Sequence, residues 1–179
     1  HACPQLSIPP GDNVSTHYIT NSSSEDCLFL NIWRPAAEKQ TRPVMVWIHT
    51  GGFMLGTIFS QTIDGRYLSS FGDVVVVTIS YRVNALGFLY GGTNDSPGNL
   101  ALHDQLLALR WIQDNIQRFG GDPNQVTLFG TSAGSMCVGA LVLSPHGNGQ
   151  FHRAIIQSGV PNSYLGSHDK KTALNLTHQ

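Results

Sequence analysis

The fold of this chain is decided by the stretch Gln125-Val126-Thr127-Leu128-Phe129-Gly130-Thr131-Ser132-Ala133-Gly134-Ser135-Met136-Cys137-Val138. Its first part has the apolar character of a strand and its last part that of a helix, with the G-x-S-x-G pattern of a nucleophile elbow between them. Small residues flank the serine in such an elbow because the turn is strained and other backbone crowds it from both sides. The pentapeptide alone also arises by chance in Gly/Ser-rich loops, but the strand and helix around it favour the elbow. The pattern predicts Ser132 as a nucleophile and the Ala133 N–H as one oxyanion donor.

Composition and charge indicate an ordinary globular domain. The chain has 179 residues, of which 41% are hydrophobic and 12% are charged, enough to bury one core and unlike a disordered chain. A formal charge of −1 gives no electrostatic case for binding nucleic acid or an anionic membrane. The longest apolar runs, residues 74–79 and 138–143, are far too short to span a bilayer.

Cysteines and glycosylation sequons indicate whether the protein is secreted or cytosolic. Cys3 and Cys27 bracket a stretch rich in Pro, Asn and Ser, so the alternatives are a disulfide that closes this loop or two free thiols in a cytosolic protein. The pattern N-x-S/T occurs at Asn13, Asn21, Asn94 and Asn175. Pro97 makes Asn94 a poor acceptor, but two sequons within one irregular loop favour a secreted, disulfide-bonded glycoprotein.

Strand and helix patterns alternate along the chain. Strands are predicted at residues 28–33, 44–48, 74–80, 125–131 and 153–158, and helices at 99–119 and 135–143. Residues 36–42 and 71–73 are expected to form turns, 81–90 to be apolar without a helical period, and 91–98 to be a loop. On the helices, Trp111 and Cys137 are expected to be core residues. This order predicts a parallel α/β sheet with Ser132 at the carboxyl edge of one strand, where such sheets place ligands.

A second glycine-rich segment, His49-Thr50-Gly51-Gly52-Phe53, follows the apolar run 44–48. A glycine pair straight after a buried strand lets the backbone turn sharply and aim consecutive N–H groups at a ligand oxygen. A flexible loop without such a role is the alternative.

Four motifs occur in an order that resembles the type-B carboxylesterase/lipase family, which includes cholinesterases and the non-enzymatic neuroligins. They are residues 24–31 (SEDCLFLN), 49–53 (HTGGF), 98–105 (GNLALHDQ) and 119–134 (FGGDPNQVTLFGTSAG), and the likeness continues to residues 157–159 (QSG). The resemblance implies an α/β-hydrolase fold: a mostly parallel central sheet with flanking helices, incomplete within these residues.

The resemblance also implies roles for individual residues. Ser132 matches the nucleophile, and Gly51, Gly52 and Ala133 match the backbone donors of the oxyanion hole. Ser158 matches a serine that helps hold the acid of the triad, with an ordinary serine at a strand end as the alternative. Cys3 and Cys27 match the first disulfide of the family. The implied partner is a small-molecule ester, with no metal or cofactor.

Three departures from the family pattern affect the expected site. Thr50 stands where the family usually has a third glycine, so the oxyanion loop would be strained if that position needed a positive φ. Thr131 replaces an acidic residue that is common beside the nucleophile. The loop between Cys3 and Cys27 contains no Trp, the residue on which cholinesterases bind a cationic head group, so a choline substrate is disfavoured.

The base and acid of the triad are not evident. In this fold they follow the serine in the order acid, then histidine, and only Asp169 followed by His178 satisfies that order. Both lie in a polar tail too close to the last predicted strand, while His49 and His103 lie in motifs where structural roles suffice. The chain is therefore expected to be a partial domain, residues 1–179, cut at both ends, with the signal peptide, acid and histidine outside it. Alone, it should be inactive and prone to aggregate through its apolar sheet edge.

Three functional hypotheses remain. The first is a secreted serine carboxylesterase that works through an acyl-serine intermediate. The second is a neuroligin-like binding protein, which would keep the fold without the chemistry; the retained Ser132 favours the enzyme. The third is a lipase for long-chain esters, and the sequence does not choose between it and the first.

Overall fold

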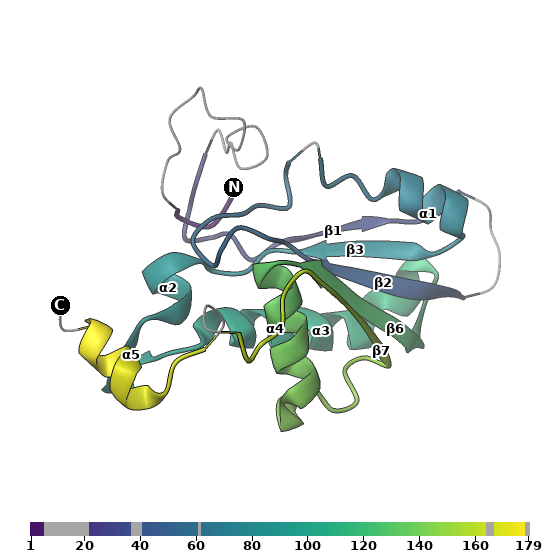
Figure 1. Ribbon diagram of the computed structural model, residues 1–179. Helices are drawn as coiled ribbons and strands as arrows, with labels where there is room; N and C mark the ends of the chain where they lie inside the picture. The colour runs from purple at the N-terminus through teal and green to yellow at the C-terminus, as the bar shows by residue number, and fades with distance from the viewer. Residues whose placement is uncertain (6–21, 37–40, 61, 164–166, 178–179) are drawn as a thin grey trace.

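A five-stranded, mostly parallel sheet forms the centre of the computed structural model (Figure 1). The structure describes residues 1–5, 22–36, 41–60, 62–163 and 167–177. The strands have the order β1-β3-β2-β6-β7, in which β1 is antiparallel to β3 and the other neighbours are parallel. Their bounds are β1 Leu30–Trp33, β2 Arg42–Ile48, β3 Val75–Ile79, β6 Gly121–Thr131 and β7 Arg153–Gln157.

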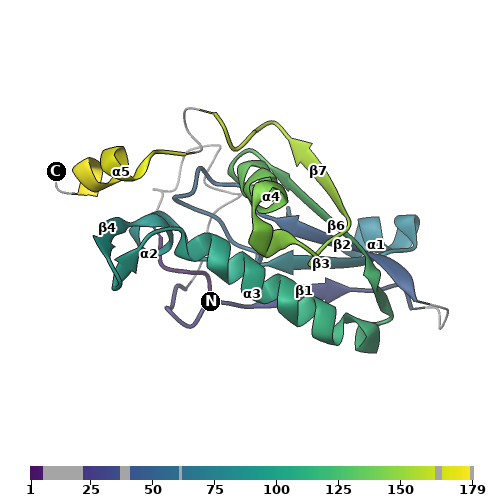
Figure 2. The ribbon, with the colours of Figure 1, turned by 90° about the horizontal axis from the view of Figure 1, so that it is seen from below.

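Helices cover both faces of this sheet. The short helix α1 lies on one face, and α3 and α4 lie on the other (Figures 1 and 2). The helices are α1 Arg66–Gly72, α2 Asn84–Phe88, α3 Leu100–Asn115, α4 Ala133–Leu143 and α5 Lys170–Thr177, and a 3-10 turn, Ile116–Phe119, extends α3. None of the helices in the described ranges is long and apolar enough to cross a membrane.

One continuous core joins the central strands to α3 and α4. It consists of buried aliphatic side chains of β2, β3 and β6 packed against buried positions of both helices. The strand members are Val44, Val46, Ile48, Val75, Val77, Ile79, Val126 and Leu128, and the helix members include Ala101, Leu106, Leu109, Ile112, Cys137, Val138 and Leu141. Cys137 is buried as predicted, and this burial raises the pKa of its thiol to about 11.

The alternating order of strands and helices is confirmed, while several local predictions are wrong. Residues 81–90 contain the short helix α2, and the loop predicted at 91–98 contains a two-stranded ribbon, β4 Tyr90–Thr93 and β5 Ser96–Pro97. Helix α1 was not predicted, because its exposed residues carry no clear apolar period, and Phe71 and Gly72, expected in a turn, are its last two residues. Arg42, placed in a turn by the sequence, begins β2, and its side chain is buried against the Asp73 carboxylate.

Trp111 is not the core residue that the helix pattern indicated. Its side chain lies on the outer side of α3 with 37% of its surface exposed, beside the ring of Phe119 at 6.0 Å between centroids. The core positions of α3 are filled instead by Leu109 and Ile112 on either side of it in sequence. A helix of this length has both apolar and exposed faces, and Trp111 lies on the exposed one.

Candidate active site

Ser132 occupies a strained turn between β6 and α4. Its φ is 55° and its ψ is −122°, values that L-residues other than glycine rarely adopt and that cost of order 1–3 kcal/mol. Its N–H donates a 2.9 Å hydrogen bond to the Gln157 carbonyl at the end of β7. The Ser132 carbonyl accepts a bond from the Met136 N–H, which starts α4 directly at the serine. The strand, strained serine and helix predicted from the G-x-S-x-G pattern are therefore present.

The two glycines of the pattern are required by close contacts. A Cβ on Gly134 would lie 2.2 Å from the Ile48 carbonyl oxygen and 2.7 Å from that of His49. A Cβ on Gly130 would lie 2.7 Å from the carbonyl carbon of Gly134. Such distances are below any normal carbon contact, so only glycine allows α4 to begin against the end of β2.

The segment after β2 lies at the same edge of the sheet as Ser132. Strands β2 and β6 are parallel neighbours in which Ile48 pairs with Gly130, so residues 49–56 leave the sheet beside the elbow. Parallel strands bring their carboxyl ends to one edge, which is where α/β sheets bind ligands. We refer to residues 49–56 as the glycine loop.

The glycine loop turns through residues with positive φ. Gly51 has a φ of 130°, Gly52 of 62° and Phe53 of 65°. The Gly51 carbonyl accepts hydrogen bonds from the N–H groups of Met54 and Leu55, which closes the turn. Thr50 is not among the described residues with positive φ, so the strain considered for a β-branched residue at position 50 does not arise. The strained non-glycine residue of this turn is Phe53 instead.

Contacts from α2 hold Phe53 in this conformation. The Asn84 N–H donates a 2.6 Å hydrogen bond to the Phe53 carbonyl, and the Phe53 ring packs edge-on against Phe88 at 5.1 Å. Asn84 itself has a φ of 52°, a conformation that asparagine tolerates better than most residues. The sequence pattern does not single out Asn84, because one asparagine at the start of the short helix α2 carries no local signal for this contact.

The backbone N–H groups of Gly51, Gly52 and Ala133 are among those without a hydrogen-bond acceptor in the described ranges. Ala133 is the first residue of α4, where the N–H groups of a helix lack intrahelical partners. These are the groups that the sequence predicted as oxyanion donors.

His49 anchors the base of the glycine loop and is fully buried. Its Nδ1 lies 2.9 Å from the Thr50 carbonyl, so Nδ1 must carry the proton because a carbonyl only accepts. Its ring stacks on Tyr81 at 4.0 Å, and the Tyr81 hydroxyl donates to the His49 carbonyl at 2.7 Å. Burial lowers the pKa of His49 from 6.5 to about 4, which keeps the imidazole neutral. These contacts are structural, as the sequence indicated.

Ser158 follows β7 at the same edge of the sheet. Its φ is 57° and its side chain is exposed. Nearby, the Ser135 hydroxyl donates to the Gly159 carbonyl at 2.6 Å, which ties α4 to the segment after β7. Thr131, the residue that replaces an acid beside the nucleophile, places its hydroxyl 3.3 Å from the Gln157 side-chain oxygen.

The structure does not bring a base to Ser132 within the described ranges. No histidine of those residues forms a hydrogen bond with the Ser132 hydroxyl; the side chains of His1, His49 and His152 bond to other residues. Asp169 directly precedes α5, and its carboxylate accepts bonds from the Thr172 N–H and hydroxyl; the bond from the N–H is the main cause of its lowered pKa. His178, its suggested partner, lies outside the described residues. His103 is exposed on α3.

The disulfide between Cys3 and Cys27 is present, as the resemblance implied. Of the sequons, Asn13 and Asn21 lie outside the described residues, while Asn94 and Asn175 are exposed. The disulfide is consistent with an extracellular protein.

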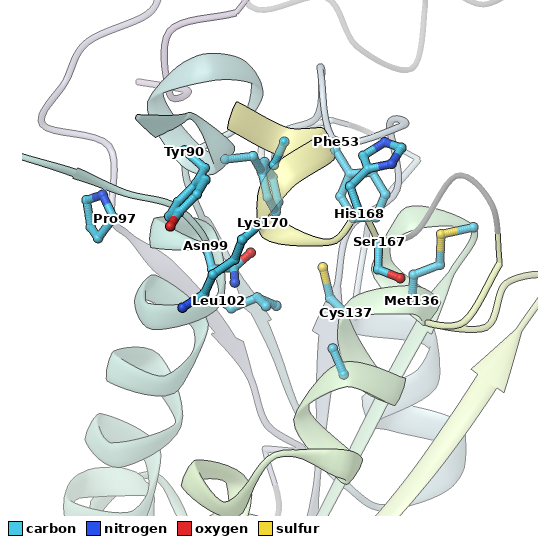
Figure 3. Close-up of a pocket in the computed structure, with 14 residues that line it drawn as sticks. Phe53, Tyr90, Pro97, Asn99, Leu102, Met136, Cys137, Ser167, His168 and Lys170 are labelled. Atoms are coloured by element: carbon cyan, nitrogen blue, oxygen red, sulfur yellow. The ribbon is translucent and has the colours of Figure 1, made fainter. Parts of the chain in front are cut away.

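A cavity of about 300 Å³ lies between the glycine loop, the start of α4 and α5 (Figure 3). Phe53 and Met136, which line it, come from the segments directly after Gly52 and Ser132. Aromatic and apolar side chains dominate its wall, with His168 and Lys170 contributed by the C-terminal segment.

The fold and the elbow define an α/β-hydrolase, and comparison with known proteins identifies the family. The chain belongs to the carboxylesterase family, because the sequence model of that family matches residues 1–178. This confirms the resemblance seen in the four sequence motifs and the fold that it implied.

Acetylcholinesterases and a carboxylesterase are among its relatives. The chain is 52% identical to acetylcholinesterase of Gallus gallus over 140 residues, which cover 78% of this chain and 18% of that protein. It is 55% identical to acetylcholinesterase of Danio rerio over 142 residues, which cover 78% of this chain and 22% of that protein. It is also 55% identical to carboxylesterase 3B of Mus musculus over 146 residues, which cover 79% of this chain and 25% of that protein. The chain thus spans between 18% and 25% of the length of these relatives.

Proposed function

We propose that the protein containing this chain hydrolyses carboxylic esters through an acyl-serine intermediate formed on Ser132. Family membership supports ester hydrolysis in general, and the strained φ of 55° at Ser132 is the observation that carries the assignment of the nucleophile. A strained backbone with positive φ, held in place by its neighbours, is typical of a nucleophile at an active site.

In this mechanism the Ser132 Oγ attacks the ester carbonyl while a histidine takes the hydroxyl proton. The N–H groups of Gly51, Gly52 and Ala133 stabilise the tetrahedral oxyanion. The intermediate collapses with release of the alcohol, which receives the proton from the histidine. Water activated by the same histidine then releases the acid and regenerates Ser132. The absence of an acceptor for these three N–H groups in the described residues supports their role as donors.

The remaining roles are part of the same proposal. Ser158 helps to orient the triad acid, supported by its position after β7 beside the elbow. The acid and the histidine are expected further along a longer protein. The disulfide and the sequons, including exposed Asn175, support a secreted glycoprotein. This is tested by treating the natural protein with an N-glycosidase, where an unchanged mass would contradict glycosylation.

A Ser132→Ala variant of the natural full-length protein tests the function. Hydrolysis of p-nitrophenyl acetate should fall at least 1000-fold, a loss of the order seen when a catalytic triad loses its nucleophile. Ser70→Ala, which alters an exposed serine of α1 on the opposite face of the sheet, is the matched control and should retain full activity. Retained hydrolysis in Ser132→Ala would remove the serine from its role. No hydrolysis by the unmodified protein would favour a binding protein of the neuroligin kind.

We also propose a neutral ester in preference to a choline ester. The relatives include acetylcholinesterases, but the stretch from Cys3 to Cys27 has no Trp to bind a quaternary ammonium group. Acetylthiocholine and S-(3,3-dimethylbutyl) thioacetate share the acyl group and the shape of the leaving group and differ in charge, so comparing their kcat/KM values tests this preference. A higher kcat/KM for acetylthiocholine would contradict it, and a longer series of acyl chains would separate an esterase from a lipase.

A further inference from the structure

Gln5 pairs its side-chain amide with the backbone N–H and carbonyl of Gly56, the last residue of the glycine loop. The Gly56 N–H donates to Gln5 Oε1 at 2.8 Å, and Gln5 Nε2 donates to the Gly56 carbonyl at 2.9 Å. The same Nε2 lies 3.2 Å from the Cys3 carbonyl. The Gln5 amide thus satisfies both the N–H and the carbonyl of Gly56, as a neighbouring β-strand would do. The two residues are 51 positions apart in the sequence.

Gly56 is the point where the glycine loop returns to its own start. It is buried, with a φ of 138°, and a Cβ there would lie 2.1 Å from Nδ1 of His49 and 2.7 Å from the Thr50 carbonyl oxygen. Gly56 therefore packs directly on the two residues that precede Gly51. A bond that fixes Gly56 fixes both ends of the turn that presents the Gly51 and Gly52 N–H groups.

The same N-terminal segment reaches the middle of the glycine loop through Asn84. Asn84 Nδ2 donates to the Pro4 carbonyl at 2.9 Å, while the Asn84 N–H holds the Phe53 carbonyl at 2.6 Å. Pro4 and Gln5 follow Cys3, which the disulfide links to Cys27 just before β1. The segment is thereby anchored to the body of the domain and contacts the glycine loop by two routes.

We propose that Gln5 is a positioning residue for ester hydrolysis, which holds the glycine loop in the conformation that aims its N–H groups at the oxyanion. The loop has three consecutive residues with positive φ and is not part of a helix or strand, so its conformation depends on such contacts. Oxyanion donors are effective because they need no reorganisation during the reaction, and small misplacements are costly. This role rests on the proposed function, since it requires that the loop serve an oxyanion.

The test replaces Gln5 by methionine, which keeps the length of the side chain and removes both hydrogen bonds to Gly56 as well as the one to the Cys3 carbonyl. In the natural full-length protein, Gln5→Met should lower kcat for p-nitrophenyl acetate about tenfold and change KM less than twofold, because the ground-state ester does not depend on the oxyanion donors. The inhibition constant of an alkyl trifluoromethyl ketone, which forms a tetrahedral oxyanion on the serine, should rise by the same factor.

Gln113→Met is the matched control. Gln113 also donates from Nε2 to two carbonyls, those of Pro123 and Gln150, but lies away from the glycine loop. Its replacement should leave kcat and the inhibition constant unchanged. Equal effects of the two substitutions on kcat and on inhibition would overturn the role of Gln5.

Asn84→Asp provides a second variant should Gln5→Met fold poorly. Aspartate tolerates the positive φ and keeps the acceptor for the Leu86 N–H, while it loses the donor to Pro4. A two- to threefold loss in kcat with the same loss in ketone affinity is expected, and unchanged values would contradict the second route. Failure of Ser132→Ala to abolish hydrolysis would instead refute the proposed function, so the two failures are distinguishable.

Discussion

Acidification should destabilise the fold through His49. In the folded protein its imidazole is buried, stacked on Tyr81 and neutral, with a pKa lowered from 6.5 to about 4 by burial. An unfolded chain has no such environment and binds a proton near pH 6.5. Between these pH values the unfolded state binds more protons than the folded state. The stability that depends on neutral His49 is therefore present above pH 6.5 and is lost as the pH falls toward 4.

The magnitude follows from the two pKa values. Well between them, each pH unit changes the free energy of unfolding by about 1.4 kcal/mol, and lowering the pH from 7.5 to 5 should cost about 2 kcal/mol in all. Keeping the pH at 5 or above limits the contribution of ordinary carboxylates, whose titration lies mostly lower.

Denaturant unfolding of the natural full-length protein at pH 7.5, 6.5, 5.8 and 5 provides the assay, with His49→Gln as the comparison. Glutamine can still donate to the Thr50 carbonyl but does not titrate. The variant should start from a lower stability and lose about 2 kcal/mol less than the unmodified protein over this range. Identical pH dependences for the two proteins would refute the reasoning that His49 is buried in its neutral form.

Three further predictions concern stability, each measured as a change in the free energy of unfolding. Gly134→Ala should destabilise the protein by about 3 kcal/mol, because its new Cβ would lie 2.2 Å from the β2 backbone. Gly120→Ala is the control, because no atom lies within 4 Å of a Cβ there. This substitution should cost about 1 kcal/mol through the φ of 78° alone. Equal costs would contradict the contact. Replacing Cys3 and Cys27 together by serine should cost about 3 kcal/mol through the freed loop, and a loss below 0.5 kcal/mol (roughly the size of an ordinary surface substitution) would argue against it. Asp104→Asn should cost about 2 kcal/mol, because it removes the buried carboxylate that accepts three hydrogen bonds from Arg82; an unchanged midpoint would mean that the pair is not formed.

The elbow was predictable from the sequence because all of its determinants are local. The strand, the two glycines, the serine and the helix are consecutive residues, and each glycine is demanded by backbone that meets it in the fold. The parallel α/β sheet was predictable as well, since alternating strands and helices have few ways to pack.

Features that depend on distant contacts were missed or misplaced. Helix α2 has five residues, too few for a period, and starts at Asn84, whose conformation depends on bonds to Phe53 and Pro4. Trp111 was assigned to the core because it is large and apolar, although neighbouring residues fill the core positions of α3. Gln5 belongs to no sequence motif, and its proposed role depends on a contact with Gly56, 51 positions away, that only the fold shows.

Mapping the site of covalent modification tests the central assignment most directly. The natural full-length protein would be treated with diisopropyl fluorophosphate, digested and sequenced by tandem mass spectrometry, alongside Ser132→Ala. We expect one phosphoryl group per chain on Ser132, loss of esterase activity in proportion to labelling, and no label in the variant. Esterase activity that survives complete labelling, or inactivation with the label on another residue, would contradict Ser132 as the nucleophile.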